Sequence, residues 1–382
     1  MERSTRSINA VGIPVSSGRG GCQGDKPERN PFLFFPQGFD MMKLSRLMLA
    51  AVAVCGTSAV MAQSSVTIYG RVNTTIEHQK VGKESVTGMY NNNSRIGFKG
   101  VEDLGNGLKA GFVLEAGFNS DDGSGPLTFA RQSEVNLSGN FGMVRLGNFF
   151  PESYYATSDY IGMHNHETGS SSDALYYDAA WFDGTGTGNK LAYRTPTFNN
   201  FWAEGSVSFH EKAKDPAKPN EVRKNAYDLA ANYNNGPLSL GAGYSYWNSN
   251  YQASLRGLYT FGQFTLGAYY QRNKNDQVLG GGHGNRNNFR LSGMYALNAS
   301  EFHVNVGHAG KWSKVADSSA TQWTLGYNYN LSKRTKVYTY YTKVNNGKNA
   351  SYGYATRDEN NNVIRANGLN TSSFAVGVRH NF

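Results

Sequence analysis

The residues of this chain best suited to chemistry are charged side chains, and they fall into two groups with different surroundings. Arginines and lysines recur inside segments in which polar and apolar residues alternate, such as Arg71 in 66–77. Carboxylates concentrate in one long segment, 150–188, which has few basic residues. Fixed charges of opposite sign that face each other across a gap concentrate and sort ions without a nucleophile or a proton shuttle. The chemistry on offer is therefore electrostatic.

Catalytic, metal and cofactor sites are weakly represented. His164 and His166 flank Asn165 and precede Glu167, a spacing that could hold a metal on an extended chain, but no thiol accompanies them. The glycine-rich run 280–284 lacks the Lys-Ser/Thr pair of a phosphate-binding loop, and no Gly-x-Ser-x-Gly turn is present. We therefore expect no catalytic, cofactor or metal site, and we expect the protein not to be an enzyme.

Alternating hydrophobicity predicts the elements that position these charges. In the C-terminal segment, Phe374, Val376 and Val378 share one face of a strand, whereas Arg379 lies on the other. Sixteen segments alternate in this way: 66–77, 93–101, 108–118, 130–138, 143–149, 189–196, 201–210, 223–233, 238–247, 251–261, 263–272, 287–297, 301–310, 321–330, 334–344 and 371–382. Such a pattern is typical of an all-β, transmembrane antiparallel β-barrel with apolar residues toward lipid and polar residues toward the lumen.

The connections between these segments support the same architecture. Short connections are rich in Gly and Asn, which supply the positive φ of tight hairpins. The long ones are 150–188, 211–222, 273–286, 311–320 and 345–370, and the stretch from Val81 to Asn93 is also expected to be a loop. Short turns at one end and long loops at the other are typical of outer-membrane barrels.

Composition and the N-terminal region indicate export. A basic start at Met42 to Arg46, a short apolar run and the small residues before Gln63 have the layout of a signal peptide. We expect residues 1–41 to be an unstructured extension from a misassigned start, 42–62 to be the signal peptide and 63–382 to be the barrel. Lipidation of Cys55 is a weaker alternative, since Val54 is large for that site. The net charge is +9, but no basic cluster indicates nucleic-acid binding.

Several motifs, in this order, carry a family resemblance. They are Ser65-Val-Thr-Ile-Tyr-Gly70, the run from Asn93 to Lys109, Phe129-Ala-Arg-Gln132, Phe141 to Gly147, Tyr193-Arg-Thr-Pro196 and Val378-Arg-His-Asn-Phe382. Together they resemble the general porins of Gram-negative bacteria, of the Neisseria and beta-proteobacterial kind. The resemblance implies a homotrimer of sixteen-stranded barrels in the outer membrane, in contact with lipid and lipopolysaccharide, with the long third loop folded into the lumen. It also implies recognition of Phe382 by the barrel-assembly machinery.

The resemblance and the alternation together define a candidate pore constriction. The resemblance matches Arg95, Arg131 and Arg194 to arginines that line the family's constriction. The expected basic wall is Arg71, Arg95, Lys99, Arg131 and Arg194, and the expected loop acids are Glu152, Asp159, Glu167, Asp173 and Asp178. Simple alternation would place Arg131 toward lipid, so either a bulge re-aims it or it lies at a strand end. Asn148 stands where the family often has a basic residue.

These expectations lead to a hypothesis for function. Excess positive charge at a narrow, low-dielectric passage concentrates anions, so we expect passive diffusion of ions and small hydrophilic solutes with weak anion selectivity. The arginines could also serve to hold the loop in place, and the two roles are compatible. The alternatives are a substrate-specific channel and a receptor or adhesin with an occluded lumen.

Overall fold

The computed structural model describes residues 65–158, 161–162, 169–178, 186–214, 216–217, 222–276, 282–354 and 366–382. Residues 64–382 form one compact unit. Its strands are β1 (Ser65–Val81), β2 (Glu84–Asn91), β3 (Arg95–Gly105), β4 (Leu108–Gly117), β5 (Gln132–Gly139), β6 (Gly142–Asn148), β7 (Lys190–Arg194), β8 (Phe201–Ser208), β9 (Ala226–Asn235), β10 (Leu238–Trp247), β11 (Asn250–Phe261), β12 (Phe264–Asn275), β13 (Gly284–Leu297), β14 (Ser300–Ala309), β15 (Ala320–Asn330), β16 (Thr335–Asn346) and β17 (Thr371–Asn381).

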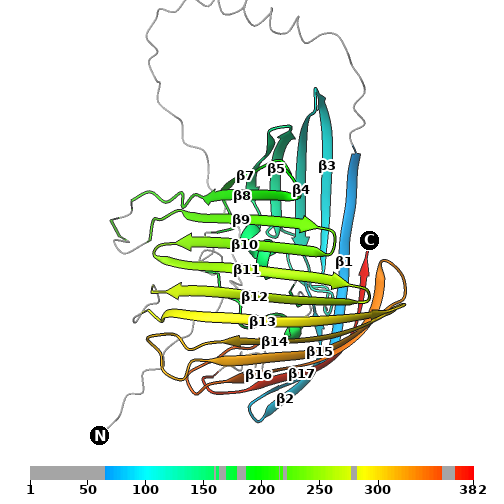
Figure 1. Ribbon diagram of the computed structural model, residues 1–382, viewed down its shortest axis with the longest axis vertical. Coiled ribbons are helices and arrows are strands. Elements are labelled where there is room, and N and C mark those ends of the chain that lie inside the picture. Colours follow the sequence, from blue (N-terminus) through cyan, green and yellow to red (C-terminus); the bar gives the residue numbers. More distant parts are fainter. Residues whose placement is uncertain are drawn as a thin grey trace, which may run out of the picture. The chain divides into compact units, whose positions relative to one another are not determined.

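The strands form a closed antiparallel barrel (Figure 1). From β3 to β17 each strand pairs with the next, and β17 pairs with β1 to close the ring. The same edge of β1 pairs with β3 along 65–71 and with β2 along 74–81. Thus β2 and β3 share one position, interrupted at 92–94, and the seventeen strands fill sixteen positions. The barrel of sixteen strands expected from the sequence is confirmed.

Each of the sixteen predicted segments coincides with a strand, but the prediction of a loop from Val81 to Asn93 is wrong. Most of that stretch is β2, and only Gly82 and Lys83 form the turn before it. Gly and Asn in this stretch concealed the alternation, while pairing with the long β1 supplies its hydrogen bonds. Tertiary pairing has overridden a weak local preference here.

The turns explain why Asn and Gly mark the strand ends. Between β3 and β4, Asn106 and Gly107 adopt φ of 52° and 77°, the left-handed conformation that a two-residue hairpin requires. Among the described residues, the predicted alternation of short and long connections has two exceptions. Two-residue turns at Gly82 and Lys83 and at Asn248 and Ser249 join β1 to β2 and β10 to β11 at the end where the long loops lie.

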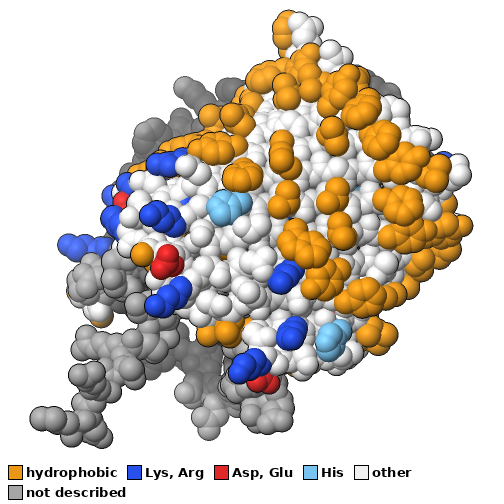
Figure 2. Space-filling view, turned by 60° about the horizontal axis from the view of Figure 1, so that its bottom comes forward, with side chains coloured by type: hydrophobic (Ala, Val, Ile, Leu, Met, Phe, Trp, Pro, Cys, Tyr) orange, Lys and Arg blue, Asp and Glu red, His pale blue; other side chains and the backbone are white. Residues whose placement is uncertain are grey.

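The outer surface is apolar, as the alternation predicts. On β17, Val376 is 52% exposed while its neighbour Ala375 is fully buried. Figure 2 shows the hydrophobic side chains spread over the strands and the Lys and Arg side chains gathered toward one side of the view. Near the short turns, aromatic rings follow one another across β11–β15 with centroids 4.8–6.4 Å apart: Tyr259, Phe261, Phe264, Tyr295, Phe302 and Tyr327. Aromatic belts of this kind suit a membrane interface.

Two short helical turns lie in the long connection between β6 and β7. They are α2 (Glu152–Thr157) and the 3₁₀ turn η1 (Gly169–Ser171). Among the residues that the structure describes, no helix has the length and hydropathy needed to cross a bilayer. Both turns contact the polar, buried side of the barrel wall, which makes this connection the element that brings loop side chains to the lumen-facing residues.

Candidate pore constriction

The helix α2 packs directly on the backbone of β10. A Cβ atom at Gly241 would lie 1.8 Å from the carbonyl oxygen of Ala156, so any larger residue there would displace the helix. At its start, the backbone N–H and the hydroxyl of Ser153 both donate to the carboxylate of Asp228 on β9, which is buried. Close backbone contact and a buried carboxylate therefore hold α2 against the inner face of the wall.

The second part of the connection is attached to several more strands. Ser170 donates a hydrogen bond of 2.8 Å to Glu77 on β1. Asp173 accepts two hydrogen bonds from the guanidinium of Arg290 on β13. Ser245 on β10 donates to Asp178 over 2.8 Å. The described residues of the connection are thus tied to widely separated strands of the wall.

Arg95 and Arg131 meet at one carboxylate of the wall, and the guanidinium of Arg131 also lies 5.8 Å from the ring centroid of Phe150 at the start of the loop. The Nε atom of Arg131 lies 2.7 Å from Oε1 of Glu115 on β4, and the Nε atom of Arg95 lies 3.6 Å from Oε2. Arg131 precedes β5, so it sits at a strand end and its side chain is not bound by the alternation of that strand. Of the two explanations offered for Arg131, a bulge or a position at a strand end, the geometry matches the second.

A second group of ion pairs continues along β5–β8 to the loop. Arg145 on β6 lies 2.8 Å from Glu134 and 2.9 Å from Glu204. Arg194 lies 2.8 Å from Glu204 and also 2.8 Å from Glu152 at the start of α2. These ion pairs join four arginines and four glutamates, which we call the charged arc: Arg95, Arg131, Arg145, Arg194, Glu115, Glu134, Glu152 and Glu204.

The remaining residues of the predicted site lie in varied surroundings. The Nε atom of Arg71 donates to Asn381 on β17 over 3.1 Å, and the Nζ atom of Lys99 lies 5.2 Å from the ring centroid of Tyr69. Of the predicted basic wall, Arg194 pairs with a predicted loop acid, Glu152, over 2.8 Å. The other two predicted acids, Asp159 and Glu167, lie outside those ranges.

Three residues of the site were missed in the sequence. Arg145 alternates with Val144 and Leu146, which points it inward, but its flanking glycines weaken the pattern. Asp228 and Glu77 also occupy inward positions, and both receive hydrogen bonds from the loop. The alternation of inward and outward residues could have placed all three, whereas the hydrogen bonds of Asp228 and Glu77 with the loop depend on the tertiary fold.

Two loop carboxylates have shifted acidities. Burial raises the pKa of Glu152 to about 7, and the nearby Arg194 opposes that shift. Burial also favours the neutral form of Asp173, but the adjacent Arg290 outweighs it and holds the pKa of Asp173 below its ordinary value. Glu152 therefore changes charge near neutral pH, while Asp173 remains ionised.

Metal and cofactor chemistry receive little support from the arrangement. In the part of the chain that the structure describes, no three His, Cys, Asp or Glu side chains gather in a way that could hold a metal ion. The pair His164 and His166 lies outside the described residues, so the structure does not bear on it. What the described geometry offers is a polar inner face with paired charges beside a docked loop.

Comparisons with known proteins agree with this architecture. The profile of the Gram-negative porin family matches residues 49–350. Outer membrane porin protein 32 of Delftia acidovorans is 33% identical over 366 residues, covering 89% of this chain and all of the relative. The major outer membrane protein P.IB of Neisseria meningitidis is 32% identical over 192 residues, which cover 44% of this chain and 54% of that protein.

A solved structure extends the likeness to three dimensions. The anion-selective porin from Comamonas acidovorans superimposes with a TM-score of 0.67 at 28% identity, covering 84% of this chain and all of the other. The closed barrel, the apolar outer surface and these matches agree on location and activity. The chain belongs to the Gram-negative porin family: it is an outer-membrane β-barrel channel and not an enzyme.

Proposed function

We propose that this porin passes ions and small hydrophilic solutes passively, with a weak preference for anions, and that Arg71, Arg95, Lys99, Arg131 and Arg194 form its basic wall opposite the acids of the 150–188 loop. The observation that carries the proposal is the charged arc next to α2. Its four arginines are matched by four glutamates, and Arg71 and Lys99 add positive charge on the same inner face. A small surplus of positive charge along the passage gives a weak preference for anions rather than a strong one.

The raised pKa of Glu152 also supports a preference for anions. With its pKa raised to about 7, Glu152 is protonated in part of the population at neutral pH. The arc then carries more positive than negative charge. The likeness to a structure described as an anion-selective porin, at 28% identity, supports this direction as well.

Single-channel recording in a planar bilayer under a KCl gradient tests the proposal. The expected reversal potential favours chloride, and Arg95→Glu is expected to lower the anion/cation permeability ratio. A potassium preference of the unmodified channel would overturn the charge assignment. An unchanged ratio in the variant would leave Arg95 with a structural role only. Block of the ion current by one solute at low concentration would favour a substrate-specific channel.

We further propose a homotrimer, export by a signal peptide at 42–62 after an unstructured segment 1–41, and assembly through Phe382 in contact with lipid and lipopolysaccharide. Phe382 supports the assembly role because its backbone exchanges two hydrogen bonds of 3.1 Å with Gly70 at the seam of the barrel. Native mass spectrometry of the exported protein tests both mass and stoichiometry. A single subunit per particle, or an intact residue 1–62 segment in the exported chain, would contradict these assignments.

A further inference from the structure

The side of α2 that points away from the barrel wall carries aromatic side chains. Ser153 and Ala156 are buried and face β9 and β10. Successive residues of a helix are rotated by about 100°, so Tyr154 and Tyr155 project to the opposite side. Both tyrosines remain partly exposed. The small, polar side of this helix therefore holds it on the wall, and its aromatic side borders the passage inside the barrel.

The two tyrosines belong to a row of four rings. The ring centroids of Phe150 and Tyr155 are 6.4 Å apart, those of Tyr155 and Tyr154 are 5.5 Å apart, and those of Tyr154 and Tyr176 are 5.3 Å apart. We call Phe150, Tyr154, Tyr155 and Tyr176 the aromatic row. Neighbouring rings of the row meet edge to face, at interplanar angles from 62° to 87°. A further aromatic ring packs favourably against such a row, because it can place its own edge on a face or its face on an edge.

One end of the aromatic row lies beside a local surplus of positive charge. The guanidinium carbon of Arg131 is 5.8 Å from the centroid of the Phe150 ring. Arg131 and Arg95 share the carboxylate of Glu115, at 2.7 and 3.6 Å, and both arginine side chains are partly exposed. Two positive charges and one negative charge leave a surplus of one. Each guanidinium has five N–H donors, so the pair can bind a second carboxylate beside the shared one.

We propose that the aromatic row and the two arginines Arg95 and Arg131 form a binding site for aromatic carboxylates, with the ring of the solute against Phe150 and its carboxylate on the guanidiniums. Chloride uses only the charge, and a neutral ring uses only the aromatic surface, whereas an aromatic carboxylate uses both. A sugar can stack on a ring but brings no charge to meet the surplus. This site rests on the proposed function, and it adds a class of solute that the passage holds longer than chloride.

Block of the single-channel current of the purified protein by an added solute tests this site. Benzoate is compared with cyclohexanecarboxylate, which has the same charge and a similar size but no aromatic ring. It is also compared with benzyl alcohol, which has the ring but no charge. Benzoate is expected to reduce the current at the lowest concentration of the three. Equal half-blocking concentrations for the two carboxylates, or stronger block by benzyl alcohol, would overturn the proposal.

Three variants separate the ring from the charge. Tyr155→Leu keeps an apolar side chain but removes the ring, and it should raise the half-blocking concentration of benzoate about fivefold, the effect of one aromatic pair. Tyr155→Phe keeps the ring and should be blocked like the unmodified channel. Arg131→Gln should weaken the block by both carboxylates alike. The proposal fails if benzoate blocks the Tyr155→Leu channel or the Arg131→Gln channel as strongly as the unmodified one.

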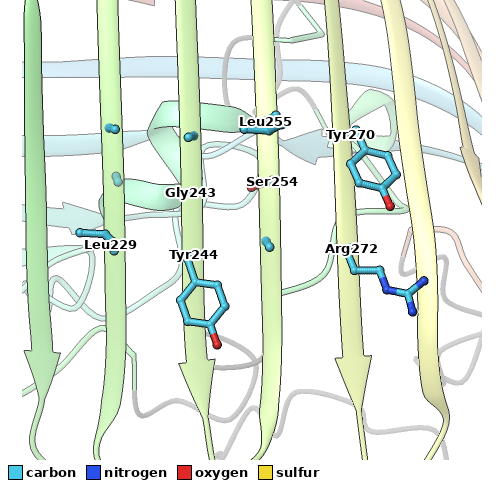
Figure 3. A pocket seen from close by; sticks show the side chains of 11 residues that line it. Leu229, Gly243, Tyr244, Ser254, Leu255, Tyr270 and Arg272 are labelled. Carbon is cyan, nitrogen blue, oxygen red and sulfur yellow. The ribbon is translucent and has the colours of Figure 1, made fainter.

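The matched control is Tyr244→Leu. Tyr244 on β10 is exposed on the outer surface, near Leu229 and Leu255 of the two neighbouring strands (Figure 3). This control should leave the block by benzoate unchanged, and a loss equal to that of Tyr155→Leu would contradict the site.

Reversal potentials in a KCl gradient are recorded on the same channels. A chloride preference without selective block by benzoate would overturn this site and leave the proposed function standing. A potassium preference would overturn the proposed function itself, and with it the surplus of positive charge on which this site depends.

Discussion

The two sides of the inner wall hold the loop by different chemistry. The charged arc on β3–β8 reaches it through Arg194 and Glu152, an ion pair of 2.8 Å. The opposite side uses the buried side-chain amides of Gln271 on β12, Asn288 on β13 and Gln322 on β15, which we call the amide arc. Three hydrogen bonds of 2.9–3.0 Å run from this amide arc to backbone carbonyls of the loop, from Gln271 to Tyr177, Asn288 to Leu175 and Gln322 to Ser172.

This difference means that the attachment of the loop and the ion selectivity of the channel depend largely on different residues. Neutral amides fix a loop without adding net charge to the passage, whereas each change in the charged arc alters the field that an ion meets. Arg290 links the two chemistries because it lies among the amides yet pairs with the ionised Asp173. Substitutions on the two sides should therefore affect different measurements.

The largest effect on stability is expected for Arg290→Met. Removing this guanidinium leaves Asp173 buried without its main counter-charge, which costs about 3–5 kcal/mol. The unfolding temperature followed by circular dichroism should fall, and current noise should rise as the loop detaches. The double variant with Asp173→Asn should recover part of the loss. An unchanged unfolding temperature would mean that this pair does not anchor the loop.

A large effect on selectivity is expected for Arg194→Glu. Two unit charges about 10 Å from an ion in water contribute about 0.8 kcal/mol, roughly a fourfold change in local anion concentration before screening. The anion/cation permeability ratio from reversal potentials should fall, most clearly at low salt. Lys343→Glu makes the same charge change on the outer surface and should leave the ratio unchanged. Equal shifts of the permeability ratio in both variants would mean that the net charge of the protein, and not the charged arc, sets the selectivity.

A smaller effect is expected from pH, through Glu152. Its pKa of about 7 in the folded protein means that it gains negative charge between about pH 6 and 8, so anion preference should decrease as pH rises. Because the folded pKa exceeds the ordinary value of 4.5, this group also destabilises the fold as pH rises from about 4.5 to 7. Reversal potentials across this range provide the measurement. Glu152→Gln should flatten the profile, and an equal slope in that variant would assign the titration elsewhere.

The smallest effect on selectivity is expected for Gln271→Met on the amide arc. This change removes the hydrogen bond to the Tyr177 carbonyl, to which Asn273 also donates over 3.5 Å, so the cost is about 0.5–1.5 kcal/mol. The unfolding temperature should fall while the permeability ratio stays the same. A shift in that ratio comparable to the shift of the Arg194 variant would remove the distinction between the two arcs.

The sequence predicted the barrel well because alternation is a local signal that strand pairing preserves. The same alternation predicted which arginines point inward. Arg131 is the exception, because it lies at a strand end. It missed β2, whose hydrogen bonds come from a strand of unusual length, and it missed the contact of Asp228 with Ser153. Both omissions concern how one segment pairs with or packs on another, which depends on register and packing rather than on local pattern.

The seam between β1 and β17 has a consequence for how the molecule forms. Arg71 and Asn381 are paired although 310 positions separate them, and Gly70 is hydrogen-bonded to the final residue, Phe382. The hydrogen-bonded ring therefore cannot close until the last strand has been delivered, and until then both edge strands expose unpaired groups. Loop closure over nearly the whole chain is slow, so folding is expected to follow complete translocation. Truncation by a few C-terminal residues should then retard barrel closure far more than it weakens the finished sheet.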